Sequence, residues 1–159
     1  MTRSLRPRTL LLMGLLALLS LVALSGCDQA VSLAAGPGPA PRTAKPGVVT
    51  VEIAYLNHPP VRPVMADVDT TLAKYGDKVQ VTKYDFDTPE GQAFAKARGL
   101  TEHTPLAIYI DGTMEFNLGG RQVKFYSFPQ GSSTPMSPPG AWTLADLDAA
   151  LAQTTGAKP

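Results

Sequence analysis

The sequence of 159 residues contains a single cysteine, Cys27. One cysteine cannot form an internal disulfide, a Cys-X-X-Cys pair or a zinc site built from several thiolates. Thiol–disulfide exchange needs a thiolate that attacks a disulfide sulfur. The composition therefore excludes both a disulfide framework and dithiol redox chemistry.

Concentrated positive charge is also scarce. Arg3, Arg6 and Arg8 lie in the first ten residues, and without them 11 basic residues face 13 acidic ones. A nucleic-acid-binding domain normally carries a basic patch, so nucleic acid is excluded as a partner. The sequence also lacks the GxSxG, HExxH, Walker and GxGxxG motifs. A cysteine-free enzyme such as a hydrolase is therefore the least supported function considered.

The first 26 residues are typical of an export signal. Three arginines precede the apolar run Leu10–Leu24, which is shorter than the roughly 20 residues of a membrane span. The run ends in Leu24-Ser25-Gly26-Cys27, which resembles the lipobox of bacterial lipoproteins. The resemblance implies a signal peptide at residues 1–26 and a diacylated Cys27 that anchors the protein to the membrane. The alternative is an ordinary signal peptide cut near Gly26, which leaves a free thiol.

The residues after Cys27 indicate where the anchor lies. Asp28 resembles the signal that keeps lipoproteins on the inner membrane of enteric-type bacteria. It implies a bacterial cell-envelope protein on the outer face of the cytoplasmic membrane, with an extracytoplasmic domain. Residues 27–47 are rich in Ala, Gly and Pro and have no apolar period, which predicts a flexible tether.

Strand and helix patterns alternate beyond the tether. Strands are predicted at residues 48–56, 79–86, 106–110 and 122–128, and 113–118 is left open as a further strand. Helices are predicted from Pro60 or Pro63 to Tyr75, from Thr88 to about Gly99, and over 143–153 with Thr143 as cap. This order favours an α/β fold, with a mixed central sheet of four to five strands flanked by helices on both faces.

Three local patterns resemble the thioredoxin-like superfamily. The elbow Asn57-His58-Pro59-Pro60-Val61 occupies the place of the family's Cys-Gly-Pro-Cys, so His58 and Val61 fall at the two cysteine positions. Lys83–Asp87 resembles the family's strand that ends in an acidic residue. Thr104-Pro105 before the strand 106–110 resembles its cis-proline strand. The resemblance implies a three-layer thioredoxin-like domain over residues 48–155 that lacks the dithiol and its redox activity.

The family's fold implies that the elbow and the loop before Pro105 lie at one end of the sheet. The only two histidines, His58 and His103, would then share a site with Asn57, Arg62 and Glu102. Two imidazoles and a carboxylate can hold Zn²⁺ or Cu²⁺, or act as a general base with an orienting acid. No HxxH or HxH spacing supports such a site, so exposed turn residues and no cofactor are the favoured interpretation.

A second expectation concerns an extended peptide. In the family, the residue before the cis-proline pairs through its backbone with a partner's peptide, and this implies the same role for Thr104. The candidate binding surface is the elbow with the loop before the strand: Asn57, His58, Pro59, Pro60, Val61, Arg62, His103, Thr104 and Pro105. The leading hypothesis is a redox-inactive, membrane-anchored binding or assembly module with a protein or peptide partner. A His-based metal-binding protein or metallochaperone is the alternative.

The Pro/Gly/Ser-rich stretch 127–142 is longer than the about 4–6 residues of a typical connection. The sequence leaves open at which end of the sheet this loop begins. The aromatic side chains near its ends are predicted to fill the core rather than stack on a ligand. They are Phe125, Tyr126, Phe128 and Trp142.

Overall fold

The computed structural model describes residues 45–101, 103–132 and 140–157. The described residues all belong to one compact unit, which spans Gly36–Pro159. Its buried core is built between Val49 and Ala152. Because this unit contains the described core in full, we expect residues 36–159 to fold by themselves.

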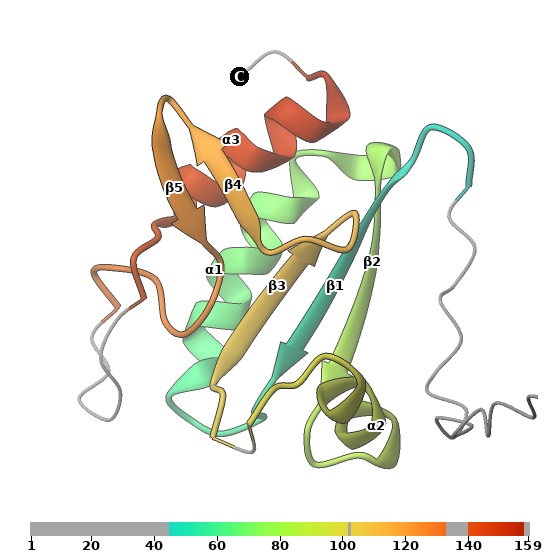
Figure 1. The fold of residues 1–159 in the computed structure, drawn as a ribbon, viewed down its shortest axis with the longest axis vertical. Helices are drawn as coiled ribbons and strands as arrows, with labels where there is room; N and C mark the ends of the chain where they lie inside the picture. The colour runs from blue at the N-terminus through green and yellow to red at the C-terminus, as the bar shows by residue number, and fades with distance from the viewer. Residues whose placement is uncertain (1–44, 102, 133–139, 158–159) are drawn as a thin grey trace, which may run out of the picture. The chain divides into compact units, whose positions relative to one another are not determined.

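A three-stranded sheet forms the centre of the fold (Figure 1). It contains β1 (Val49–Tyr55), β2 (Val79–Asp85) and β3 (Leu106–Ile110) in the order β2-β1-β3. β2 is parallel to β1 and β3 is antiparallel to it, with Tyr55 beside Asp85 on one side and Leu106 on the other. The carboxyl ends of β1 and β2 and the amino end of β3 therefore meet at one edge, called here the carboxyl edge.

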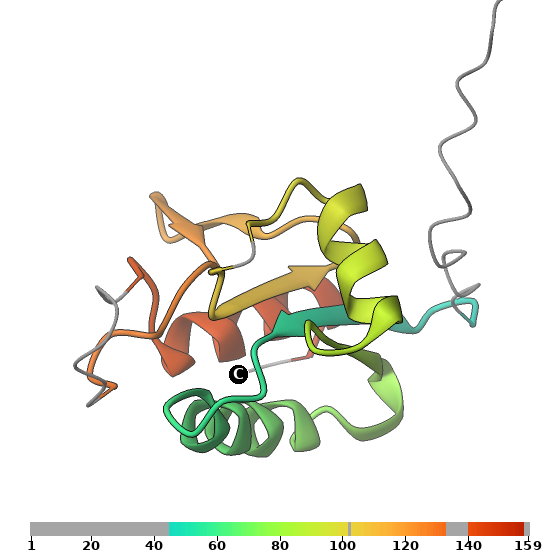
Figure 2. The same cartoon turned by 90° about the horizontal axis from the view of Figure 1, so that it is seen from below.

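Helices cover both faces of this sheet, as the alternating pattern predicts (Figure 2). α1 (Val61–Ala73) and α3 (Leu144–Thr155) lie on one face, and α2 (Pro89–Ala97) lies on the other. The first face carries the larger core, which includes Val51, Ile53 and Ile108 and the helix residues Val68 and Leu151. The smaller core on the second face gathers around Phe94: Ala54, Tyr84, Phe86, Ala107 and Tyr109.

The prediction of one sheet with four to five strands is wrong. The described residues contain five strands, but β4 (Glu115–Leu118) and β5 (Arg121–Lys124) form a separate two-stranded sheet. After β5 the backbone bends, and Ser127 adopts a positive φ of 65°. Two backbone hydrogen bonds then join this segment to β3, from Ile108 N to Phe125 O and from Ser127 N to Leu106 O. The bend interrupts the regular pairing that a fourth strand of the central sheet would need.

The predicted helix starts are confirmed at two places. The Thr88 hydroxyl accepts a hydrogen bond from Gly91 N, which caps α2. Thr143 and Asp146 form a reciprocal capping box at the start of α3. A short 3₁₀ turn, Gly76–Lys78, follows α1 and leads into β2.

The aromatic residues near the ends of the stretch 127–142 fill the core, as predicted. Phe125, Phe128 and Trp142 are buried and Tyr126 is half-buried. The Trp142 indole N–H donates to the carbonyls of Tyr126 and Ser127, and its ring meets the Phe125 ring edge to face at 5.5 Å. Because Ser127 bonds to Leu106, the loop begins at the carboxyl edge; residues 133–139 lie outside the described part.

Candidate binding surface at the carboxyl edge

The fold brings the elbow after β1 next to the loop before β3. The Leu56 amide donates to the Pro105 carbonyl at 3.1 Å, directly beyond the Tyr55–Leu106 pair of the sheet. The end of β2 lies on the other side of β1, where the Phe86 amide donates to the Tyr55 carbonyl. Three segments that are far apart in the sequence therefore form one polar surface.

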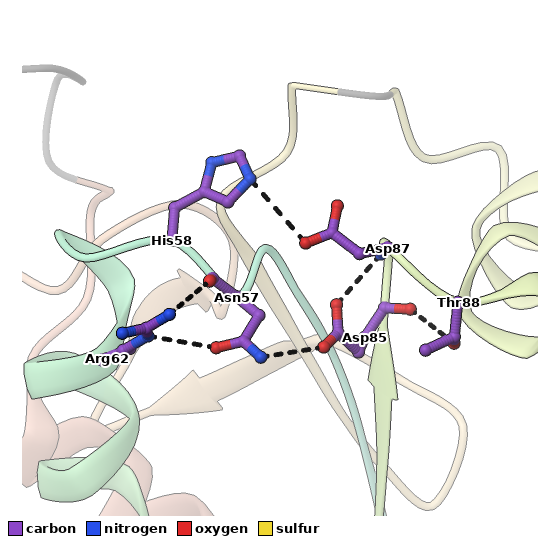
Figure 3. A network of polar contacts seen from close by, with 6 residues as sticks. All are labelled: Asn57, His58, Arg62, Asp85, Asp87 and Thr88. Carbon is purple, nitrogen blue, oxygen red and sulfur yellow. Dashed lines mark hydrogen bonds and ion pairs between the residues drawn. The ribbon is translucent and has the colours of Figure 1, made fainter.

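Asn57 lies at the centre of this surface (Figure 3). Its side-chain amide donates to Asp85 Oδ2 at 3.1 Å, and its Oδ1 accepts from Arg62 Nε at 3.3 Å. A second Arg62 nitrogen points at the Asn57 carbonyl at 3.4 Å. Asn57 thus links the end of β2 to the first turn of α1, which fixes the elbow without a disulfide.

His58 and Asp87 extend the same cluster toward solvent. His58 Nε2 lies 3.8 Å from Asp87 Oδ2, and the two side chains are 55% and 60% exposed. The Asp87 amide donates to Asp85 Oδ1 at 2.9 Å, so Asp85 also holds the turn that carries Asp87. Asn57, His58, Arg62, Asp85 and Asp87 are called the edge network below.

The start of α1 offers few free donors to a ligand. The amides of Val61 and Arg62 already donate to the His58 carbonyl, and Pro60 and Pro63 have no N–H. The Arg62 guanidinium is exposed and has no carboxylate within ion-pair distance among the described residues. The positive charge at this edge therefore comes from a side chain rather than from the helix end.

The two elbow positions that are predicted to match the cysteines of the thioredoxin-like superfamily differ in their surroundings. Val61 is 2% exposed and belongs to the larger core, whereas His58 is exposed. Pro59 is exposed and Pro60 is half-buried as the residue before the helix. Of the predicted elbow residues, Val61 is thus inaccessible to a ligand, and Asn57, His58, Pro59 and Arg62 form the accessible part.

Thr104, which is expected to pair with a peptide, is buried and its backbone amide is bonded within its own loop. Thr104 is 1% exposed, its amide donates to the Thr101 carbonyl, and its hydroxyl lies 3.1 Å from the Tyr126 hydroxyl. The peptide bond before Pro105 is trans, as are all peptide bonds of the described residues. The loop folds back on itself through a turn at residues 101–104, and this turn occupies the amide that a partner strand would need.

The structure does not join the two histidines. His103 is exposed on the loop before β3, and no hydrogen bond or ion pair links it to His58 in the described part of the chain. The described residues contain no group of three or more His, Cys, Asp or Glu side chains that could hold a metal ion. Glu102 lies outside the described residues, so the predicted His58–His103–Glu102 site stays a prediction.

A shallow hollow adjoins the edge network between α1 and β2. It has a volume of about 210 Å³ and is open to solvent. Tyr55, Met65 and Ala66 form its apolar part, and Asn57, Arg62, Asp69 and Lys83 form its polar part. Its openness suits contact with a side chain of a partner better than enclosure of a small substrate.

Sequence reasoning missed two members of the edge network, Asp85 and Asp87. The segment Lys83–Asp87 was identified only as the acidic end of a strand. One feature of the sequence could have identified them: polar residues follow both β1 and β2. The carboxyl ends of neighbouring parallel strands lie at one edge of a sheet, so these polar residues are expected to lie close together. Applied here, that rule brings Asn57 and His58 close to Asp85 and Asp87.

No protein-family model, curated protein or solved structure matches this chain. In the described residues, no helix has the length and apolar character that crossing a membrane requires. Cys27 and the whole predicted export signal lie outside the described residues.

Proposed function

We propose that the protein is a bacterial envelope lipoprotein, anchored through Cys27, whose thioredoxin-like domain has no redox activity and serves as a binding module. The export signal and the lipobox-like Leu24–Cys27 support the location. The parallel β1–α1–β2 unit, the antiparallel β3 and the helices on both faces support the thioredoxin-like assignment. The presence of His58 and the buried Val61 at the family's cysteine positions supports a function without thiols.

The main support for a binding function is the exposed, positioned side chain of Arg62. Its side chain is exposed but held by Asn57 Oδ1, and it has no carboxylate partner among the described residues. An arginine that is positioned in advance loses less side-chain entropy when it forms a charged hydrogen bond. The edge network is therefore suited to a protein partner that presents a carboxylate, with the hollow beside Met65 receiving a neighbouring apolar group.

Site-specific photocrosslinking in the membranes of the producing cells tests this function. A photoreactive amino acid at Pro59, which is exposed beside the edge network, should give a discrete crosslinked product. Arg62→Glu should reduce that product at least tenfold, because a carboxylate would then face the carboxylate of the partner. Ten-fold corresponds to about 1.4 kcal/mol, close to the lower end of the about 1.5–3 kcal/mol of a hydrogen bond to a charged group.

Two controls separate recognition from general damage. The same photoreactive residue at Gln153, exposed on α3, should not give this product, and Lys96→Glu on α2 should leave the Pro59 product unchanged. Equal products from Pro59 and Gln153, or a Pro59 product that is indifferent to Arg62→Glu, would rule out this surface as the binding site.

A further inference from the structure

The hollow between α1 and β2 carries a charge that its own wall does not balance. Its charged lining residues are Arg62, Asp69 and Lys83. The Lys83 ammonium lies 2.7 Å from the Asp69 carboxylate, so these two charges neutralise each other. Arg62 has no carboxylate within ion-pair distance among the described residues. The wall is therefore left with one positive charge, at the end of the hollow where Arg62 lies.

A bridge of side chains bounds the hollow at this end (Figure 3). Asn57, which follows β1, donates to Asp85 at the end of β2 and accepts from Arg62 in the first turn of α1. The opposite end is open, because the hollow shares Asp69 and Lys83 with a second depression further along α1 and β2. A chain that lies in the hollow has room to continue past Lys83, whereas Asn57 and Arg62 lie across its path at the other end.

The floor beside Arg62 is apolar. Tyr55, Met65 and Ala66 form it, and the last two follow Arg62 by three and four residues on α1. Residues at these spacings are neighbours on a helix surface, with Cβ atoms about 5–6 Å apart. The positive charge and the apolar floor therefore adjoin each other.

Tyr55 adds an uncharged hydrogen-bond donor to the hollow. Its hydroxyl has no hydrogen-bond partner among the described residues. Burial, followed by the nearby Asp85, raises the pKa of Tyr55 above its usual 10.0, so the hydroxyl keeps its proton at neutral pH. The hollow thus offers a cation and a neutral donor to the oxygens of one anionic group.

The last residue of a polypeptide matches this arrangement better than an internal acidic residue does. In a terminal residue, the carboxylate and the side chain are attached to the same Cα, and the chain continues in one direction only. An internal Asp or Glu carries its carboxylate at the tip of the side chain. The next side chain on the same face of an extended peptide is about 6.5 Å further along, and the backbone continues at both ends.

We propose that the hollow binds the C-terminal residue of a partner polypeptide, with its α-carboxylate on Arg62 and an apolar last side chain on Tyr55, Met65 and Ala66. The inference rests on the proposed binding function and names the part of the partner that this surface recognises. Because Asn57 already holds the Arg62 side chain, less side-chain entropy is lost when the carboxylate binds.

Titration of residues 36–159 with three synthetic peptides, followed through amide chemical shifts in NMR spectra, tests the inference. The first probe is acetyl-Gly-Ser-Ala-Ala-Leu with a free carboxylate, and the second is the same peptide with a C-terminal amide. The third is acetyl-Gly-Ser-Ala-Glu-Leu-Ala-amide, whose only carboxylate is on an internal side chain. The free acid should shift the signals of Arg62 and Ala66, and the other two peptides should bind at least tenfold more weakly.

Matched substitutions test both parts of the hollow. Arg62→Ala should weaken binding of the free acid at least tenfold, whereas Lys96→Ala on exposed α2 should not change it. Ala66→Leu fills the hollow and should weaken binding at least fivefold, whereas Ala97→Leu, the same change on the exposed surface of α2, should not. Circular dichroism confirms that each variant is folded.

The outcomes separate this inference from the proposed function. A preference for the free acid that is lost in Arg62→Ala and in Ala66→Leu supports it. Equal binding of the three peptides, tighter binding of the internal glutamate peptide, or no shift with the free acid at millimolar concentration overturns it. The proposed function has its own readout, since crosslinking from Pro59 in membranes that depends on Arg62 would support a binding module even then.

Discussion

At the scale of single residues, two tyrosines on opposite faces of the sheet differ in one respect. The hydroxyl of one has a hydrogen-bond partner, and the hydroxyl of the other has none among the described groups. The Tyr75 hydroxyl donates to the Asp148 carbonyl at 2.6 Å and lies 3.0 Å from its carboxylate. The Tyr109 hydroxyl is buried with no partner among the described groups, while the Arg98 guanidinium lies over its ring at 4.5 Å. Tyr75 thus ties the chain just after α1 to α3, whereas the Tyr109 hydroxyl contributes no such link.

Tyr75 predicts how stability depends on alkaline pH. Burial, together with the hydrogen bond to Asp148, raises the pKa of Tyr75 to about 12 from its usual 10.0. The unfolded chain loses this proton near pH 10 and the folded chain keeps it to about pH 12, so the free energy of unfolding decreases between these values. Tyr75→Phe should cost about 1 kcal/mol at pH 7 through the lost hydrogen bond. Urea unfolding should show the difference between the two proteins shrinking as the pH rises from 9 to 11.5.

Tyr109→Phe provides the comparison. Removing a buried hydroxyl that has no partner should leave the free energy of unfolding at pH 7 unchanged or increase it. If the difference in the free energy of unfolding between Tyr75→Phe and the unmodified protein stayed constant up to pH 11.5, stability would not be coupled to the ionisation of Tyr75. Equal destabilisation by both substitutions at pH 7 would contradict the difference in their hydrogen bonding.

At the scale of elements, Gly91 explains how α2 reaches the sheet. A Cβ atom built on Gly91 would lie 1.8 Å from the Asp85 carbonyl oxygen and 2.4 Å from its carbon. Both atoms are backbone at the end of β2, so the helix must retreat for any side chain to fit. The close approach of α2 to the edge network therefore depends on the absence of a side chain at this position.

Gly91→Ala should destabilise the domain by about 1–3 kcal/mol, the range for overpacking a close contact, although alanine is the better helix former. Gln92→Ala, one residue further along and exposed, should change the free energy of unfolding by no more than about 0.5 kcal/mol. Chemical denaturation of the two variants of residues 36–159 measures both. If Gly91→Ala left the free energy of unfolding unchanged, α2 could move away from β2 without loss of stability.

The elements themselves could largely be predicted from the sequence, because local patterns determine them. The apolar positions Val61, Val64 and Val68 recur at helical spacing and are buried in α1, and Thr143 caps α3. The division into two sheets could not be predicted, because it depends on the positive φ of Ser127 and on two long-range hydrogen bonds. Likewise, the pairing of Asn57 with Asp85 joins residues 28 apart and follows from strand order, which no local pattern encodes.

At the scale of the whole molecule, the predicted lipid anchor at Cys27 would determine where the domain acts. Cys27 follows three arginines and an apolar run, and it is the only cysteine of the sequence. Two or more acyl chains, each burying many CH₂ groups at about 0.8 kcal/mol apiece, give a stable membrane attachment.

Metabolic labelling tests the anchor. Cells that express the full chain and receive an alkyne analogue of palmitate should incorporate the label, and Cys27→Ala should abolish it while Ser32→Ala leaves it intact. If an ordinary signal peptidase cuts the chain instead, the opposite result is expected. The exported protein would then carry no lipid label and would react with a maleimide at its free Cys27 thiol.

Trp142 is the only tryptophan of the chain and is fully buried between the aromatic core and the carbonyls of Tyr126 and Ser127. Its fluorescence therefore reports on one defined place, where α3, the bend after β5 and the larger core meet. Burial shifts indole emission to shorter wavelengths, and unfolding returns it to that of indole in water. Domain unfolding can thus be followed by intrinsic emission at low protein concentration, without attaching a dye.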